Sequence, residues 1–202
     1  GELLLWLGRY EEALAEFERC LRIEVHTRWG YIGRLGTEVM LGRPRDALRS
    51  CDEGVRVMRG SGPSQFVYRA EALEQLGRLD EALVDAEEAL LRNPTRLGGW
   101  LTAAILRGRT GNTAGRDALV ERLRLHAPAL LVEAASAGPG AEDPDALLRA
   151  ARASLRGNRS SSCITFFDRR GGLRRLQRPR PDAVALAEAG TQRRTVLEGV
   201  AA

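Results

Sequence analysis

The residue types that most often carry catalysis or metal binding are few in this sequence and stand far apart. Its two histidines, His26 and His126, are one hundred residues apart, and neither has further ligands at the spacing of a metal site. Both fall near the end of an expected helix, where a histidine more commonly interacts with the helix dipole. Nucleophile, phosphate-loop and dinucleotide motifs are also absent from the sequence. We therefore expect a protein that is not an enzyme and has no catalytic residue, metal or cofactor.

The one cluster that could supply a nucleophile is Cys163 with Asp168 and the serines at positions 160–162. No histidine stands beside it to take up a proton, and packing within a strand accounts for Cys163 equally well. The other cysteines, Cys20 and Cys51, lie on apolar faces of expected helices, where a reduced cysteine acts as a small hydrophobic residue. Because the three cysteines are widely spaced and form no CxxC pattern, we expect a reduced, cytoplasmic protein. No segment approaches the roughly 18 apolar residues of a membrane span, so no membrane partner is expected.

Arginine offers more chemistry, since all 31 basic residues are arginine. A guanidinium is a permanently charged planar fork suited to carboxylates and phosphates. Residues 1–130 contain 19 arginines and 19 acidic residues, whereas residues 146–202 contain 12 and 4, a net charge of +8. Six of these arginines form a basic tail near Phe166 and Phe167: Arg169, Arg170, Arg174, Arg175, Arg178 and Arg180. This tail could bind nucleic acid through phosphate contacts and base stacking, or it could be a solvated surface.

The larger part of the chain is organised by a repeat of 34 to 35 residues. Three segments share the pattern LGR-x-x-[DE]-AL, namely Leu7–Leu14, Leu41–Leu48 and Leu76–Leu83. In each segment a glycine ends one helix in a left-handed conformation, and an alanine five residues later lets two helices approach closely. A fixed period of this size is typical of a solenoid, in which each helical hairpin buries its apolar face against its neighbours. The sequence therefore predicts an all-α fold, which the abundance of Ala, Leu and Arg also favours.

These segments resemble the tetratricopeptide repeat, whose pattern is W-x2-L-G-x2-Y, then A-x3-F, then P. The third unit matches most fully, through Phe66, Ala70, Leu73, Ala82, Ala86 and Pro94. The resemblance implies a right-handed solenoid of about three and a half helical hairpins over residues 1–137. In the fourth unit Arg116 stands where the pattern has alanine. That leaves its register open, because Ala118 takes this position if the turn is two residues longer.

The residues after the repeats predict a small C-terminal appendage. Glycine and proline at positions 138–140 break the helical pattern. The dipeptide Asp143-Pro144 then indicates the N-cap and first residue of a helix over residues 143–157. We expect this helix to cap the end of the solenoid, because solenoids need a terminal element with a polar outer face.

The Arg-rich segment 158–202 contains the only β-prone run of the chain. Its pattern is compatible with a β-hairpin over residues 163–177, with the turn at Gly171 and Gly172. At the other end, the sequence begins at Gly1 inside what reads as a helix. We therefore expect the chain to be part of a longer protein with more repeats upstream.

In proteins of the tetratricopeptide family, the first helices of the hairpins line a concave groove that receives a peptide or a partner helix. The resemblance implies a partner-binding groove made of Arg34, Thr37, Met40, Val67, Tyr68, Glu71, Glu74, Leu101, Thr102, Ile105 and Arg109. Some family members grip a terminal carboxylate with lysine and asparagine on these helices, but this chain has no lysine. Its groove is instead apolar with an acidic centre, which suits an amphipathic helix bearing arginine or lysine.

These observations predict a cytoplasmic scaffold or adaptor that binds another protein or peptide in the groove. The partner could be a basic amphipathic helix, the chain's own basic tail, or the same tail of a second copy in a homo-oligomer. Two alternatives stay open at this point. The repeats could be the recognition region of a larger enzyme or regulator, or the basic tail could bind nucleic acid.

Overall fold

The computed structural model describes residues 1–136, 142–156, 164–167 and 173–176. The chain divides into two compact units, residues 1–157 and 158–202. The described part of the first unit is all-helical and comprises α1 (Glu2–Trp6), α2 (Tyr10–Ile23), α3 (Arg28–Met40), α4 (Pro44–Met58), α5 (Pro63–Gln75), α6 (Leu79–Arg92), α7 (Leu97–Arg109), α8 (Thr113–His126), α9 (Pro128–Ser136) and α10 (Pro144–Arg156). Helices α1 to α8 form successive hairpins.

Each of these hairpins turns at a glycine with positive φ: Gly8 at 72°, Gly42 at 67°, Gly77 at 76° and Gly111 at 86°. The N–H of the residue after the glycine donates to a carbonyl five residues earlier, as Arg43 N does to Glu38 O at 2.9 Å. This is the long hydrogen bond of a Schellman helix end, which needs a left-handed residue that glycine adopts without strain. The predicted turns at Gly8, Gly42 and Gly77 are therefore confirmed.

The same geometry fixes the register of the fourth unit. The alanines five residues after the first three turn glycines, Ala13, Ala47 and Ala82, are fully buried. Gly111 forms the fourth turn, so Arg116 occupies the corresponding position and the turn is not lengthened. The reading in which Ala118 takes this place is wrong, and the chain places a long cation where its other units place a methyl group.

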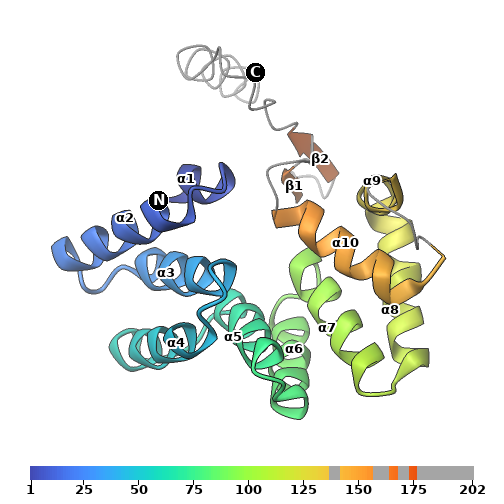
Figure 1. Ribbon diagram of the computed structural model, residues 1–202, viewed down its shortest axis with the longest axis horizontal. Helices are drawn as coiled ribbons and strands as arrows, with labels where there is room; N and C mark the ends of the chain where they lie inside the picture. Colours follow the sequence, from blue (N-terminus) through green and yellow to red (C-terminus); the bar gives the residue numbers. More distant parts are fainter. Residues whose placement is uncertain (137–141, 157–163, 168–172, 177–202) are drawn as a thin grey trace. The chain divides into compact units, whose positions relative to one another are not determined.

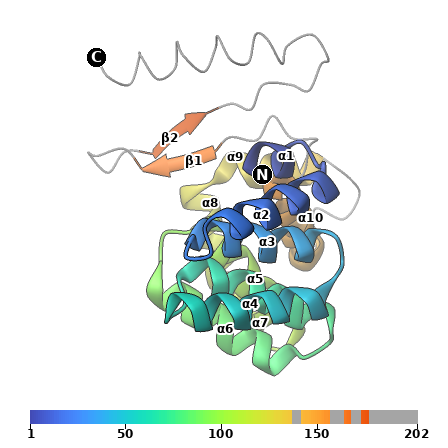
Figure 2. The same ribbon diagram turned by 90° about the vertical axis from the view of Figure 1, so that its left-hand side faces the viewer.

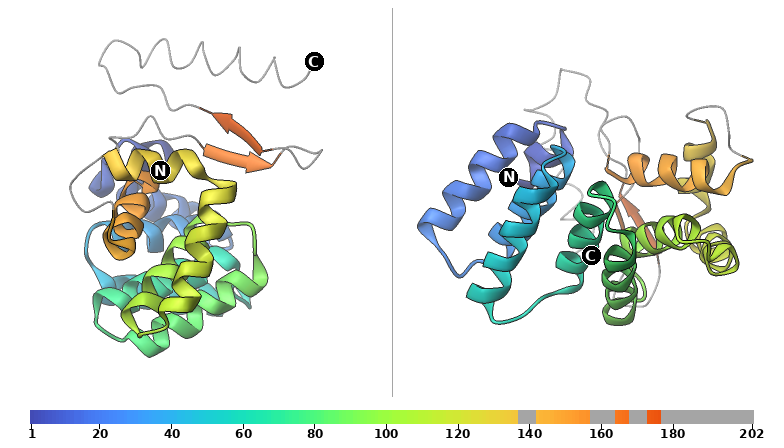
Figure 3. Two further views of the ribbon diagram at one scale, coloured as in Figure 1. Left: turned by 90° about the vertical axis from the view of Figure 1, so that its right-hand side faces the viewer. Right: turned by 60° about the horizontal axis from the view of Figure 1, so that its bottom comes forward.

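The hairpins stack in chain order. Each helix from α1 to α8 packs against the next, and the first helices also contact one another, α3 with α5 and α5 with α7. The hairpins follow one another along an arc (Figures 1 and 3), and from the α1–α4 end the later hairpins lie behind the earlier ones (Figure 2). The side formed by α3, α5 and α7 is the inner face. The main apolar cluster extends from α5 to α10, and a smaller one joins α3, α4 and α5.

Helix α10 begins where the sequence predicts. The carboxylate of Asp143 accepts hydrogen bonds from the backbone N–H of Asp145 at 3.0 Å and of Ala146 at 3.2 Å. Pro144 is the first helical residue, where its missing N–H is not needed. The position of the helix was not foreseen, because α10 packs against α7 on the inner face as well as against α9 (Figure 1). Its role as an end cap stays a prediction.

In residues 158–202 the structure describes β1 (Ile164–Phe167) and β2 (Leu173–Leu176). The strands pair antiparallel, with Ile164 opposite Leu176 and Phe167 opposite Leu173. Both lie within the range 163–177 in which the sequence pattern is compatible with a hairpin. The candidate nucleophile cluster of Cys163, Asp168 and residues 160–162 lies outside the described residues. Among the helices that the structure describes, none is both long and apolar enough to cross a membrane.

Candidate functional site

Most of the predicted groove residues are not free on the inner face. The side chains of Thr37, Val67, Glu71, Glu74, Leu101, Thr102 and Ile105 are buried, none of these residues being more than 9% exposed. The expectation that they are exposed is therefore wrong. Tertiary packing explains the difference, because other helices of the chain cover this face. Leu101 and Ile105 belong to the same apolar cluster as Leu147 and Leu148 of α10.

The groove residues predicted for α3 lie between helices. Thr37 donates its hydroxyl hydrogen bond to the carbonyl oxygen of Gly33 at 2.6 Å, within its own helix. Arg34 reaches Glu53 of α4, and Met40 packs half-buried against the cluster of α3, α4 and α5. Their assignment to an open groove is wrong, because α2 and α4 both pack against α3 and leave little of it uncovered.

Two acidic side chains of α5 lie under α10. Arg152 of α10 contacts Glu74 through two bonds, Nη1 to Oε2 at 2.6 Å and Nη2 to Oε1 at 3.3 Å. Arg109 of α7 also donates to Glu74, at 3.0 Å. A carboxylate that is only 9% exposed thus has two guanidinium partners, which offset the penalty of burying its charge.

The second acidic side chain, Glu71, is 2% exposed and pairs with Arg156 of α10. The hydroxyl of Thr102 donates to its Oε1 at 2.8 Å. The Arg156 guanidinium also lies 6.0 Å from the centre of the Tyr68 ring, which allows a cation–π contact. Desolvation lowers the pKa of Arg156 to about 10, so the side chain still carries its charge near neutral pH.

A third ionic contact holds the beginning of α10. Arg116 of α8 donates to Asp145 at 3.1 Å, and its side chain is only 13% exposed. Gly108 of α7 leaves the room for this pair, since a Cβ there would lie 2.6 Å from Asp145 Oδ1 and 3.1 Å from Arg116 Cδ. The departure from alanine at position 116 is thus matched by a glycine opposite it.

Between these ionic contacts α10 buries an apolar stripe. Leu148 and Ala151 are fully buried and Leu147 is 8% exposed, all within the main apolar cluster. The spacing is that of an amphipathic helix whose apolar face meets the core while arginines flank it. The inner face around α5 and α7 is therefore occupied by α10, a basic amphipathic helix of the same chain.

A family model described as tetratricopeptide repeat matches residues 1–24, which span α1 and α2. The α1–α2 hairpin is thus similar to a tetratricopeptide repeat. No curated protein matches the sequence. The hairpins α3–α4, α5–α6 and α7–α8 have the same glycine turn as the matched hairpin, with similar φ at each.

The remaining candidates lie outside the inner face. His126 packs edge-on against Trp100, with ring centroids 5.5 Å apart, and the backbone N–H of His26 donates to Glu24. Cys51 is 2% exposed, and burial raises the pKa of its thiol to about 11, which disfavours the reactive thiolate. Within the part of the chain that the structure describes, no three His, Cys, Asp or Glu side chains are grouped as around a metal ion.

The basic tail can be placed only in part. Arg174 and Arg175 belong to β2. Arg169, Arg170, Arg178 and Arg180 lie outside the described residues. Nucleic-acid binding by this segment stays a prediction.

The sequence pattern did not identify α10 as the occupant of the inner face, although two signals for it were present. Arg152 and Arg156 are four residues apart on a helix with an apolar stripe, which is the chemistry that the acidic groove was expected to select. The arginine at position 116 was a second signal, because an exceptional cation in a packed position needs a nearby carboxylate. That carboxylate is Asp145 at the start of the same helix.

Proposed function

We propose that this chain is a protein-binding module whose inner face receives a basic amphipathic helix from a partner. In this proposal the hairpins form the right-handed solenoid of the tetratricopeptide family, and the chain acts by binding and not by catalysis. The single observation that carries it is the docking of α10, because the surface already holds a helix of this chemistry through Glu71 and Glu74. Cys20 and Cys51 are free thiols, which supports the cytoplasmic location as part of the proposal.

The docked helix indicates what a partner must supply. Two arginines four residues apart would face Glu71 and Glu74, and leucine or alanine on the adjoining face would replace Leu148 and Ala151. Neutral helices are disfavoured, because they would leave the buried carboxylate of Glu71 without a counter-charge and that of Glu74 with Arg109 alone. The specificity therefore comes from charge at the centre of the surface and from apolar packing at its edge.

A partner must compete with α10. A tethered helix acts at an effective concentration on the order of 1 mM, so a free peptide of equal intrinsic affinity binds the intact chain weakly. A partner that is longer, or that is held nearby by a second contact, can displace it. The same helix of a second copy has identical chemistry and would meet the same surface, which accommodates the predicted homo-oligomer.

A peptide-binding measurement tests this proposal. A fluorescently labelled peptide with the sequence of residues 144–156 is titrated with the intact chain and with the double variant R152E/R156E. The variant places carboxylates against Glu71 and Glu74, so α10 should leave the surface. We expect the variant to bind the peptide at least tenfold more tightly than the intact chain, as loss of a tethered competitor requires.

Two controls make the result specific. R149E also reverses an arginine charge on α10. However, Arg149 is 56% exposed and lies 3.8 Å from Asp143, which is a long distance for an ion pair. R149E should therefore leave peptide binding at the level of the intact chain. A peptide in which only the residues corresponding to Arg152 and Arg156 are replaced by glutamine should not bind the R152E/R156E variant. The proposal fails if R152E/R156E binds no better than R149E, or if it binds both peptides alike.

A further inference from the structure

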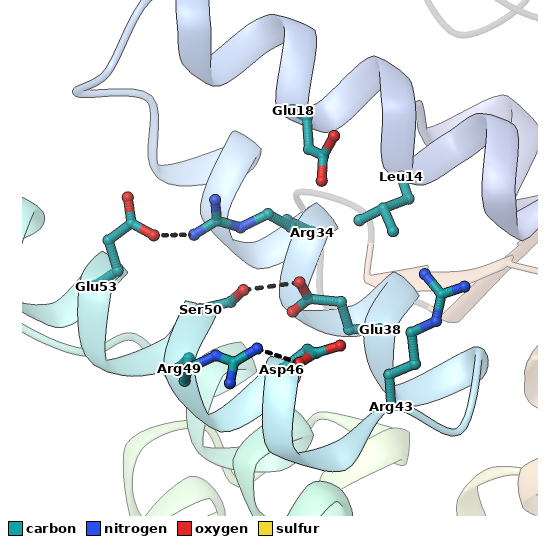
Figure 4. Close-up of a pocket in the computed structure, with 9 residues that line it drawn as sticks. All are labelled: Leu14, Glu18, Arg34, Glu38, Arg43, Asp46, Arg49, Ser50 and Glu53. Atoms are coloured by element: carbon teal, nitrogen blue, oxygen red, sulfur yellow. Dashed lines mark hydrogen bonds and ion pairs between the residues drawn. The ribbon is translucent and has the colours of Figure 1, made fainter.

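A separate pocket lies between α2, α3 and α4. Because α2 and α4 both pack against α3, a space of about 320 Å³ remains between them, and α3 forms its floor (Figure 4). This volume is near the lower limit of small-ligand pockets and is many times the roughly 30 Å³ share of one water molecule. It is therefore large enough for one extended side chain or a small organic ion.

The floor of the pocket contains a carboxylate that is not fully satisfied. Glu38 is 7% exposed, and its Oε1 accepts a hydrogen bond from the Ser50 hydroxyl at 2.9 Å. Its Oε2 is buried and has no hydrogen-bond partner. Figure 4 shows the carboxylate directed into the pocket between Leu14, Ser50 and Arg43. A buried carboxylate oxygen without a partner is costly, so the arrangement favours a ligand that donates to it.

The other charges of the pocket largely neutralise one another. Arg34 pairs with Glu53 and Arg49 pairs with Asp46, both in the pocket wall, while Arg43 reaches Glu11 outside it at 2.8 Å. Within the described residues, neither Glu18 nor Glu38 forms an ion pair. Glu18 points into the same space from α2 (Figure 4). Burial raises the pKa of Glu38 and the charge of Glu18 adds to this rise, whereas Ser50 and Arg34 oppose it. Two carboxylates therefore face the pocket without a direct ion-pair partner.

We propose that this pocket binds the guanidinium group of an arginine side chain or of a small guanidine. A planar guanidinium can donate to the free Oε2 of Glu38 and to Glu18 at the same time, and it supplies the positive charge that both carboxylates lack. Leu14 provides an apolar wall for the carbon chain behind it. The proposal does not depend on α10 or on the surface that it covers, because none of the residues lining the pocket belongs to α5, α7 or α10.

Two probes distinguish the sources of this group. Agmatine represents a small guanidine, and the peptide acetyl-Ala-Ala-Arg-Ala-Ala-amide represents an arginine side chain. Their binding to the full chain is measured by isothermal titration calorimetry near pH 7, beside the same peptide with citrulline, whose urea group is nearly isosteric but neutral. We expect binding of at least one guanidine and none of the citrulline peptide. Agmatine binding indicates a free ligand, whereas binding of the peptide alone indicates a protein partner.

Variants locate the bound group. E38Q should weaken binding about tenfold, because a charge-assisted hydrogen bond is lost, and E18Q should weaken it by a smaller factor. E12Q serves as the matched control, since Glu12 lies on the same helix as Glu18 but pairs with Arg9 at 2.6 Å and lines no part of the pocket. Circular dichroism verifies that each variant is folded. Binding that E38Q and E12Q affect equally, equal binding of the citrulline peptide, or no binding of either guanidine overturns the proposal.

Discussion

The buried carboxylates of this chain differ in how their charge is compensated. Asp85 of α6 is 2% exposed and receives two bonds from Arg69, of which Nε to Oδ2 is 2.6 Å. Glu74 has two guanidinium partners. Glu38 has only the hydroxyl of Ser50 on one oxygen. Since an uncompensated buried charge is the costliest of these arrangements, Glu38 is the residue whose removal should stabilise the fold.

The first prediction concerns the pH dependence of stability. Burial raises the pKa of Glu38, the charges of Glu18 and Asp46 act in the same direction, and Ser50 and Arg34 oppose them. A carboxyl with a raised folded-state pKa contributes stability below its unfolded pKa, and this contribution is lost as the pH rises through the folded pKa. E38Q cannot ionise, so it should gain stability relative to the parent chain as the pH is raised from about 4 to 7.

Urea unfolding at a series of pH values measures this difference. The remaining charged residues of the pocket, Arg43, Arg49 and Glu53, are unchanged in both proteins and cancel in the comparison. E12Q is a control with the opposite pH dependence. The hydrogen bond from Arg9 lowers the pKa of Glu12, so the stability that Glu12 contributes is lost as the pH falls. Parallel stability curves for E38Q and the parent chain would show that the fold does not raise the pKa of Glu38.

At the scale of the element, the turns were predictable because each depends on local sequence. A glycine with positive φ, a Schellman hydrogen bond and a small residue five positions later lie within a segment of ten residues, as Glu38 to Ala47 illustrates. Asp143 and Pro144 likewise mark the start of α10 without reference to the rest of the fold. Local hydrogen bonding thus accounts for what the sequence predicted well.

The exposure of a helix face could not be predicted in the same way. Val67 and Leu101 are apolar whether a partner or another helix of the same chain covers them, and the pattern of one helix does not reveal which. Arg34 could face a groove or a neighbouring helix with equal local propensity. The packing of α4 on α3 decides the question for Arg34, and the return of α10 onto α7 decides it for Leu101. That return depends on contacts between residues as far apart as Glu71 and Arg156.

The second prediction tests the close packing of α2 and α3. A Cβ at Gly33 would lie 2.2 to 2.5 Å from ring atoms of Phe17, which is itself 8% exposed. Gly33→Ala should therefore lower the free energy of unfolding by about 1–3 kcal/mol through overpacking. Gly98→Ala is the matched variant in α7, where the nearest atom is 3.9 Å away, and it should raise stability by about 0.5 kcal/mol.

Chemical denaturation of both glycine variants measures the two effects. Opposite signs are expected because the intrinsic preference of alanine for helix is common to both sites, whereas the steric clash is not. Stabilisation by both variants would contradict the close contact between Gly33 and the ring of Phe17.

At the scale of the whole molecule, α10 joins parts of the chain that are far apart in sequence. Asp145, Arg152 and Arg156 connect it to α8 and α5, and its leucines complete the cluster around α7. A stack of helical hairpins is otherwise held only by contacts between neighbouring hairpins. A helix on the inner face therefore both tightens the C-terminal hairpins and blocks the surface that a partner would use.

Hydrogen–deuterium exchange of residues 144–156 in the intact chain tests this account most directly. Exchange is measured for the chain without peptide and for the chain with an excess of an isotopically heavy peptide of the same sequence, which mass spectrometry distinguishes from α10. We expect α10 to be protected alone and to exchange faster as the peptide takes its place, while α5 and α7 stay protected. An α10 that exchanges freely without peptide, or that is equally protected at saturating peptide, would contradict the claim that the inner face is a helix-binding surface with α10 as its displaceable occupant.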